Sequence, residues 1–368
     1  MLKRFSVSNF KNFKNKVTLN LGNPLNYEFN QEVIKNGCIS KAIVLGINGS
    51  GKSNLGLALF DIILHLTDKE KLILKYNPYS NLDSKKGSTE FEYDFVFHGK
   101  SVQYRYAKRN QAELVYESFI IDGEEVVNYD YRENTGFTTL KGAETLNLVS
   151  SKNKISRVKY IKGNAIFVED DINNIIFDEF MNFVDNMLLF YSLDERGYQG
   201  FSIGPDSFTQ GIIREGKTKE FEEFLKENDI NYNLIEKEIN GYKELFCHFS
   251  NGDIAFVTIA STGTKSLALF YYWYIKFSKV SFVYIDEFDA FYHYELSESL
   301  VKLLKKLGNT QVILTSHNTD LLSNDMLRPD CYIVLKNNSI KSFSESTNKD
   351  IRRAHNIQKM YKAGSFNE

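Results

Sequence analysis

The sequence predicts an α/β fold built on a buried parallel sheet, and three observations support this. A glycine-rich loop, GINGSGKS at residues 46–53, follows the apolar residues 43–45 and precedes apolar residues at helical spacing. Two later apolar runs, at residues 280–285 and 311–315, each end in polar or acidic residues. Near-continuous apolar strands are typical of a parallel sheet that is buried on both faces. Because such sheets bind ligands at the carboxyl ends of their strands, we expect the loop and both strand ends at one edge.

The composition excludes several other classes of protein. Of the 368 residues, 42% are hydrophobic and 14% aromatic, which excludes an intrinsically disordered chain. The formal charge of −2 provides no overall field that would attract DNA or anionic lipid. Three widely spaced cysteines without a CxxC pair disfavour a zinc site or disulfides and fit the reducing cytoplasm. The longest apolar run, residues 267–277, is too short to cross a bilayer, so we expect a cytoplasmic protein without a membrane partner.

The glycine-rich loop fits the Walker A pattern GxxxxGK[ST] in its required strand, loop and helix context. Glycines in such a loop let backbone N–H groups turn toward phosphate, and the following helix adds the positive end of its dipole. Lys52 is expected to reach the outer phosphates, and the Ser53 hydroxyl is expected to ligate Mg²⁺. The predicted cofactors are therefore ATP and Mg²⁺. The residues predicted to bind the nucleotide here are Gly46, Asn48, Gly49, Ser50, Gly51, Lys52, Ser53 and Asn54.

The two later strand ends supply the other groups that ATP hydrolysis needs. Asp286 and Glu287 follow the first run, with Asp286 expected to hold the metal and Glu287 to act as general base. His317 follows the second run, and a histidine there can sense the γ-phosphate because it both donates and accepts hydrogen bonds. The predicted catalytic residues are Lys52, Glu287 and His317, and the predicted metal site is Ser53 with Asp286.

The segment STGT at residues 261–264 begins a strongly apolar helix. Its small residues fit an ordinary N-cap, and they equally fit a helix N-terminus that binds phosphate. Because one chain already has its own phosphate loop, a phosphate at Ser261 and Gly263 would belong to a second molecule.

Taken in order, these motifs resemble those of ABC-class ATPases of the SMC and RecF kind. They resemble more closely the AAA family ATPases of bacterial abortive-infection and phage-defence operons. FSVSNFKNF at residues 5–13 is similar to the opening strand and turn of that family, STGTKSL to its shortened ABC signature, and LTSHNTDLL to its switch-histidine segment. YIDEFDAFYHYEL resembles its Walker B segment, with His293 where many ABC ATPases have an aspartate.

The resemblance implies a P-loop NTPase fold of the ABC ATPase type, with an antiparallel β arm and a mainly helical insert. It also implies that Ser261 and Gly263 contact the γ-phosphate of an ATP bound by the partner subunit. ATP would then hold together a homodimer or a higher oligomer. The family further implies a switch or sensor that hydrolyses ATP and controls a separately encoded effector, such as a nuclease or toxin, in anti-phage defence. A RecF-like DNA-maintenance clamp and an ATP-dependent assembly scaffold with little hydrolysis remain alternatives.

The chain order predicts three regions around these motifs. Residues 1–145 and 245–345 are expected to form the ATPase lobe, and alternating stretches from residue 89 to residue 126 are expected to form its β arm. Residues 146–244 are predicted to be a mixed, largely helical insert, and 346–368 a C-terminal docking helix. A basic run within the insert fits either nucleic-acid contact or a solvated charged face; its members are Lys152, Lys154, Arg157, Lys159 and Lys162.

Overall fold

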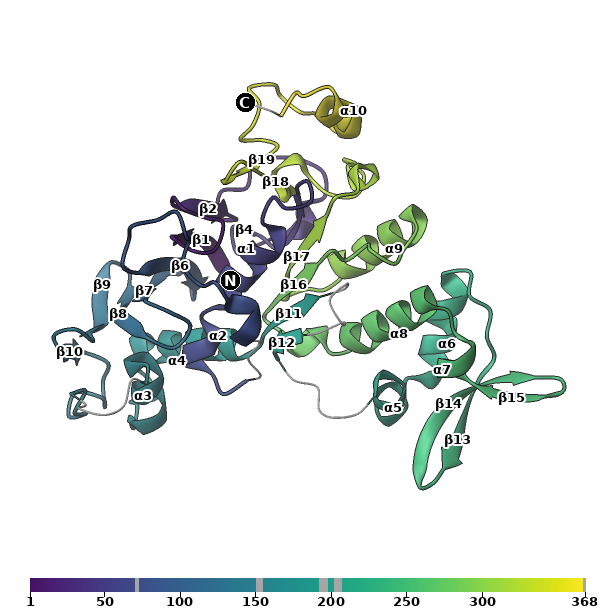
Figure 1. Ribbon diagram of the computed structural model, residues 1–368, viewed down its shortest axis with the longest axis horizontal. Coiled ribbons are helices and arrows are strands. Elements are labelled where there is room, and N and C mark those ends of the chain that lie inside the picture. Colours follow the sequence, from purple (N-terminus) through teal and green to yellow (C-terminus); the bar gives the residue numbers. More distant parts are fainter. Residues whose placement is uncertain (70–72, 150–154, 192–197, 202–206, 367–368) are drawn as a thin grey trace.

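Two seven-stranded sheets form the body of the protein (Figure 1). The computed structural model describes residues 1–69, 73–149, 155–191, 198–201 and 207–366. The core sheet has the order β12-β11-β16-β17-β5-β18-β19, in which the five central strands are parallel and the two edge strands antiparallel. Its strands are β5 (Lys41–Leu45), β11 (Met187–Tyr191), β12 (Tyr198–Gly200), β16 (Phe282–Asp286), β17 (Gln311–Ser316), β18 (Tyr332–Lys336) and β19 (Ser339–Ser342).

The second sheet is the predicted antiparallel β arm, which the structure confirms. Its order is β10-β9-β8-β7-β6-β1-β2, so the opening strand of the chain pairs with β6 in the middle of the arm. Aromatic residues alternate along the buried face of β6 and β7, which explains why the period-two pattern was visible in the sequence. The strands are β1 (Leu2–Ser8), β2 (Val17–Asn20), β6 (Thr89–Phe97), β7 (Lys100–Lys108), β8 (Leu114–Ile121), β9 (Glu124–Asp130) and β10 (Thr135–Thr138).

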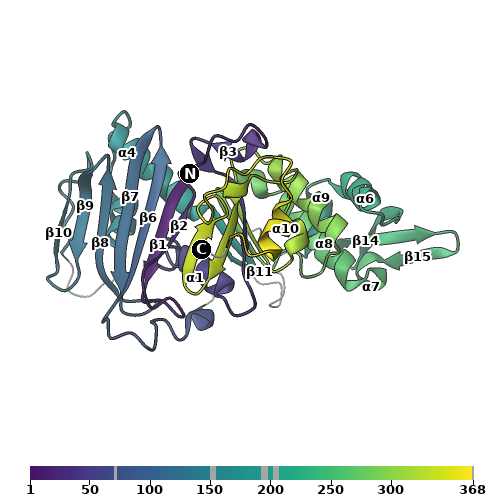
Figure 2. The same ribbon diagram turned by 90° about the horizontal axis from the view of Figure 1, so that it is seen from above.

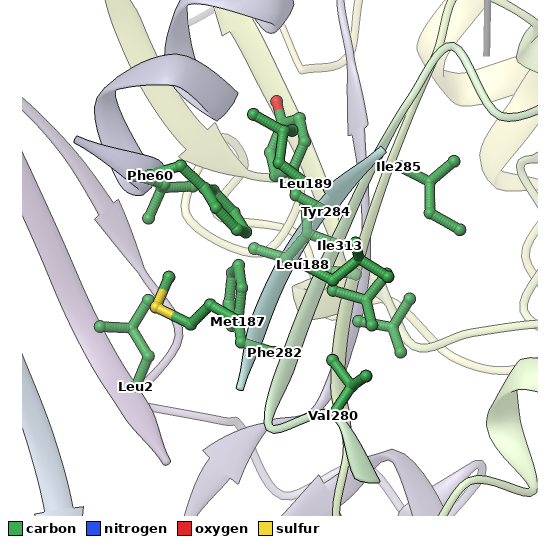
Figure 3. Close-up of a cluster of buried hydrophobic side chains, with 14 of the residues drawn as sticks. Leu2, Phe60, Met187, Leu188, Leu189, Val280, Phe282, Tyr284, Ile285 and Ile313 are labelled. Carbon is green, nitrogen blue, oxygen red and sulfur yellow. The ribbon is translucent and has the colours of Figure 1, made fainter. Parts of the chain in front are cut away.

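Helix α1 (Lys52–Phe60) lies between the two sheets. On the core side, the Tyr284 hydroxyl of β16 donates to the Lys52 carbonyl at 2.6 Å. On the arm side, the Tyr93 hydroxyl of β6 donates to the Ala58 carbonyl at 3.0 Å. Figure 3 shows Phe60 of α1 near Met187 and Phe282, where the two sheets approach each other. The helix is therefore apolar on almost all sides, as expected of a helix buried in a core.

Two helices cover the far face of the core sheet, and a separate lobe lies beyond them (Figure 2). Helices α8 (Thr262–Tyr274) and α9 (Tyr294–Lys305) lie on the side of the core sheet away from the arm. A three-stranded sheet with its flanking helices projects beyond them: α5 (Phe208–Arg214), α6 (Thr218–Glu227), β13 (Leu234–Ile239), β14 (Tyr242–Phe249), β15 (Gly252–Ala255) and α7 (Phe256–Ile259). The shorter elements are α2 (Ile63–Leu66), β3 (Ile34–Lys35), β4 (Cys38–Ile39), η1 (Gln31–Val33), η2 (Ile73–Tyr76), η3 (Phe277–Lys279), η4 (Thr319–Leu321) and η5 (Pro329–Cys331).

The structure differs from the predicted domain boundaries within residues 146–244. This stretch supplies α3 (Arg157–Asn164), α4 (Ile172–Asp185), α5 and α6, but it also supplies β11 and β12 of the core sheet. Helix α4 ends at Asp185, and the apolar run MLLFY that follows it forms β11 instead of a further part of a helical insert. A five-residue apolar run has no periodicity that separates a buried helix from a buried strand.

The C-terminal segment also differs from its prediction. Only α10 (Ile357–Lys362) is α-helical in the described part of residues 346–368. Ile351 is buried outside the helix and Ala354 is exposed, so the segment is not one helix with a single buried face. The segment nevertheless packs on its own chain, because the Phe366 ring stacks on Phe343 at 4.0 Å between ring centroids.

In the basic run, the side chains that the structure describes make contacts within the chain. Arg157 is buried, with its guanidinium 4.8 Å from the centroid of the Tyr129 ring. Lys159 forms an ion pair with Asp68, and Lys162 forms one with Asp178. Lys152 and Lys154 lie outside the described residues. These contacts disfavour a nucleic-acid surface, and the burial of Arg157 removes it from any solvated charged face.

A fully buried ion pair connects the end of α1 to the arm. The Lys108 ammonium of β7 lies 2.6 Å from Asp61 Oδ1, and both side chains have no exposed surface. The same carboxylate accepts hydrogen bonds from the Tyr79 hydroxyl at 2.7 Å and the Tyr106 hydroxyl at 3.0 Å. Removing the cation would leave a buried carboxylate with uncompensated charge.

Lys108→Met is therefore expected to lower the free energy of unfolding by about 3–5 kcal/mol, measured by urea denaturation. The control is Arg109→Met, which removes a neighbouring exposed ion pair with Glu113 and should cost less than about 1 kcal/mol. Equal losses in the two variants would contradict a structural role for the buried pair.

Candidate nucleotide-binding site

The glycine-rich loop connects β5 to α1 in a conformation that needs its glycines. Gly49 and Gly51 have φ angles of 78° and 108°, which residues with a side chain rarely adopt. A Cβ atom on Gly46 would lie 2.8 Å from the Leu335 carbonyl oxygen, so the loop also packs closely against β18. Asn48 and Gly49 are exposed at the tip of the loop.

The buried Lys52 side chain turns back onto its own loop. Its ammonium donates to the Gly46 carbonyl at 2.8 Å and to the Ile47 carbonyl at 3.4 Å. Phosphate oxygens could replace these carbonyls as acceptors without moving the base of the side chain. The lysine therefore lies within the loop that would surround the phosphates.

Ser53 and Asp286 meet across 233 residues of sequence. The Ser53 hydroxyl donates to Asp286 Oδ2 at 2.6 Å. A hydroxyl and a carboxylate are hard oxygen ligands of the kind that Mg²⁺ uses together with substrate phosphates. Among the described residues there is no cluster of three or more His, Cys, Asp or Glu side chains that could hold a metal without such phosphates. The donor set thus fits Mg²⁺ bound together with a nucleotide.

Thr315 orients both acidic residues, and no local pattern in the sequence marks it as part of the site. Its side chain is fully buried; the hydroxyl donates to Asp286 Oδ1 at 2.7 Å and accepts from the Glu287 backbone N–H at 2.7 Å. Glu287 itself has a φ angle of 48°, in the left-handed region that costs energy for a residue with a side chain. A single hydroxyl therefore fixes the direction of one carboxylate and the backbone of the other.

His317 lies on the exposed loop after β17, beside a buried carboxyl group. Asp289 Oδ2 accepts from the Ser316 hydroxyl at 2.7 Å, and Ser316 Oγ accepts from the Asn318 N–H at 2.8 Å. Burial raises the pKa of Asp289, while the bond from Ser316 and the charges of His317 and Lys52 act in the opposite direction. Asp289 thus joins the Walker B segment to the histidine loop, a role that no local sequence pattern predicts.

The opening turn of the chain supports the phosphate loop from outside. Asn12 accepts from the Asn54 side-chain amide at 2.7 Å and donates to the Ser50 carbonyl at 3.4 Å. A Cβ atom on Gly51 would lie 2.5 Å from the Asn12 side chain, which is a second reason for glycine at that position. The segment containing Asn12 was recognised in the sequence, but its contact with the loop was not.

Ser261 and Gly263 lie elsewhere, at the start of α8. The Ser261 hydroxyl accepts from the Thr264 N–H at 3.1 Å and so caps the helix, and Ser261 is exposed. A Cβ atom on Gly263 would lie 3.3 Å from the Phe291 carbonyl oxygen, which places α8 against the segment that follows Glu287. No hydrogen bond among the described residues joins Ser261 or Gly263 to the phosphate loop. His293, in the same segment as Phe291, caps α9 by accepting from the Leu296 N–H at 3.1 Å.

Comparison with protein families shows which family contains most of this chain. Residues 41–323 match the family described as "AAA domain, putative AbiEii toxin, Type IV TA system". The chain belongs to this family. The phosphate loop, the acidic strand end and the histidine segment described above all lie within the matched residues. A comparison with curated proteins found no match.

Comparison with solved structures shows that the fold is that of SMC head domains. An SMC head bound to the C-terminal winged-helix domain of ScpA is 14% identical with a TM-score of 0.50, over 92% of this chain and 96% of that chain. The SMC head domain from Thermotoga maritima is 14% identical with a TM-score of 0.44, over 92% and 97% of the two chains. An SMC head derived from Pyrococcus furiosus, bound to the C-terminal domain of ScpA, is 13% identical with a TM-score of 0.44, over 92% and 95%. In the described part of this chain, every helix is too short or too polar to cross a membrane.

The Thr315 contacts predict a difference between two conservative substitutions. Thr315→Val keeps the shape of the side chain but leaves Asp286 Oδ1 and the Glu287 N–H without this partner. The free energy of unfolding should therefore fall by about 2–3 kcal/mol. Thr315→Ser keeps the hydroxyl, and its free energy of unfolding should fall by only about 1 kcal/mol because one buried methyl group is missing. Chemical denaturation of both variants provides the measurement. A valine variant as stable as the serine variant would show that the hydroxyl does not hold these groups.

Proposed function

We propose that this protein is an ATP-hydrolysing switch that dimerises on ATP and controls a separately encoded effector in anti-phage defence. The observation that carries the ATPase part is the 2.6 Å contact between Ser53 and Asp286 beside the Lys52 loop. Folding brings together a phosphate loop and a metal-binding carboxylate that are 233 residues apart in sequence. The family and the fold support the same class of activity.

In the proposed mechanism the loop N–H groups and Lys52 bind the triphosphate, and Lys52 exchanges its loop carbonyls for phosphate oxygens. Bound Mg²⁺ would neutralise phosphate charge, held by the Ser53 hydroxyl and, through water, by Asp286. Glu287 orients the attacking water and accepts its proton, and Thr315 keeps that glutamate in its left-handed conformation. His317, whose loop is fixed through Ser316 and Asp289, contacts the γ-phosphate.

The second half of each site would come from another copy of the chain. Ser261 and Gly263 lie at an exposed N-terminus of the 13-residue helix α8, whose dipole favours a negative charge. The exposure of Ser261, at the end of α8 that lies beside Phe291, supports binding to the nucleotide of the partner subunit. ATP would then close the dimer, and hydrolysis would release it.

The output is proposed to lie in another protein. The family description, which names a toxin of a toxin–antitoxin system, supports a role in defence. The SMC head that is bound to a ScpA domain is a protein of this fold that engages a separate protein. The alternatives are a RecF-like clamp, which requires ATP-dependent DNA binding, and an assembly scaffold, which requires dimerisation with little hydrolysis. The intramolecular contacts of Arg157, Lys159 and Lys162 disfavour the clamp.

Glu287→Gln is expected to reduce ATP hydrolysis at least about 100-fold while ATP and Mg²⁺ still bind, because only the proton acceptor is lost. Light scattering should show the mass rise from that of the 42.5 kDa chain toward a dimer, most strongly in this variant. Lys52→Ala is the control, since it should neither hydrolyse ATP nor change mass. Purification from a host that carries the neighbouring genes would identify an effector bound to the trapped dimer. A mass that does not respond to ATP in any variant would rule out the nucleotide-clamped switch.

A charge placed at Ser261 tests whether each nucleotide site combines the phosphate loop of one chain with Ser261 of another. Asp and Asn both cap helices well, but Ser261→Asp would place a negative charge against the partner's γ-phosphate. We expect Ser261→Asp to reduce hydrolysis about 100-fold and Ser261→Asn to remain active. Mixing Ser261→Asp with the inactive Lys52→Ala variant should restore hydrolysis, because each mixed dimer contains one site with an intact loop and an intact Ser261. A mixture that stays inactive would mean that each chain completes its own site.

A further inference from the structure

Tyr191, at the carboxyl end of β11, lies beside the metal-binding carboxylate. In the parallel pairing of β11 with β16, Leu189 is in register with Tyr284, and Tyr191 with Asp286. Residues in register on neighbouring strands point to the same face of a sheet, and this face alternates with every residue. The side chains of Tyr191 and Asp286 are therefore neighbours on one face.

That face is the one covered by α1. A Cβ atom built on Gly56 of α1 would lie 2.8 Å from the Tyr284 ring and 3.3 Å from Leu189, so both side chains point toward the helix. Figure 3 shows Leu189 and Tyr284 side by side. Asp286, two residues after Tyr284, points the same way and meets Ser53. Tyr191, two residues after Leu189, is thus directed toward the phosphate loop side of the sheet.

The Tyr191 hydroxyl is buried without a hydrogen-bond partner among the described residues. The residue is only 4% exposed, and its ring is held against the Lys75 ammonium at 4.3 Å from the ring centroid. A buried hydroxyl without a partner loses its hydrogen bonds to water and gains none in the fold. Buried polar groups of this kind call for an explanation, such as a ligand that binds there. By contrast, the hydroxyls of Tyr76, Tyr93 and Tyr284, which also contact α1, each donate to a backbone carbonyl.

We propose that Tyr191 is a further ligand-binding residue, whose hydroxyl donates a hydrogen bond to an oxygen of the nucleotide–Mg²⁺ complex held by Ser53 and Asp286. This inference rests on the proposed ATP binding. The oxygen belongs either to a phosphate or to a water on the metal, and both are acceptors for a phenol at this position. Tyr191 completes the site on the β11 side of Asp286, opposite the β17 side from which Thr315 binds the same carboxylate.

The test compares Tyr191→Phe with Tyr76→Phe. Both remove one buried phenol oxygen, but the Tyr76 hydroxyl donates to the Leu57 carbonyl at 3.1 Å and contacts Gln199. Without nucleotide, Tyr191→Phe should melt at or above the wild-type temperature, because it removes an unsatisfied polar group, whereas Tyr76→Phe should melt lower. With ATP and Mg²⁺, Tyr191→Phe should bind about tenfold more weakly by calorimetry, and Tyr76→Phe should bind as wild type does.

Repeating the titration in EDTA identifies the acceptor. A weakened affinity that persists without Mg²⁺ assigns the bond to a phosphate oxygen, and a loss seen only with Mg²⁺ assigns it to a metal-bound water. Wild-type affinity in Tyr191→Phe would overturn the inference, as would a fall in its melting temperature to that of Tyr76→Phe. A wild-type protein that binds no ATP would overturn the proposed function and this inference together, so the two failures are distinguishable.

Discussion

The position of α1 between two sheets is the constraint on which the rest of the molecule depends. Its first residues belong to the phosphate loop, and its last residue precedes the buried Asp61. Tyr284 holds the first turn against the core sheet, and Tyr93 holds the last turn against the arm. Because each contact is a hydrogen bond to a backbone carbonyl, the two sheets together determine where the helix lies along its axis and how it is rotated. The arm therefore helps to position the helix that follows the phosphate loop, although none of its strands supplies a predicted catalytic residue.

The many tyrosines follow from this arrangement. The last carbonyls of a buried helix cannot reach water, so they need donors from within the protein, and Tyr76 and Tyr93 donate to those of Leu57 and Ala58. Tyr284 adds a hydrogen bond to the Lys52 carbonyl in the first turn. Tyrosine supplies a large apolar ring for packing and a hydroxyl that reaches the carbonyl. Burial raises the pKa of the phenols of Tyr76, Tyr93 and Tyr284 well above the usual value, so each keeps its proton and remains a donor.

Sequence patterns predicted the parts of the site that local chemistry defines. The phosphate loop, the acidic strand end and the arm were visible because glycine spacing, an apolar run and a period of two depend only on nearby residues. Thr315 and Asp289 were missed because their roles arise from contacts between strands that are distant in sequence. Strand β11 was missed for a related reason: its five apolar residues continue an apolar helix, and only pairing with β16 defines them as a strand. Asn12 belonged to a recognised segment, but its target lies about forty residues away along the chain.

The left-handed backbone at Glu287 has a consequence for how this protein can change. Glycine adopts a φ angle of 48° with little strain, so a glycine at this position would relax the segment after β16. Selection for thermal stability alone would thus tend to replace the residue on which hydrolysis is proposed to depend. Libraries screened only for expression or heat resistance should accumulate well-folded chains that have lost the glutamate. A stable but inactive homologue would then be a natural product of the same fold, separated from the ATPase by one codon.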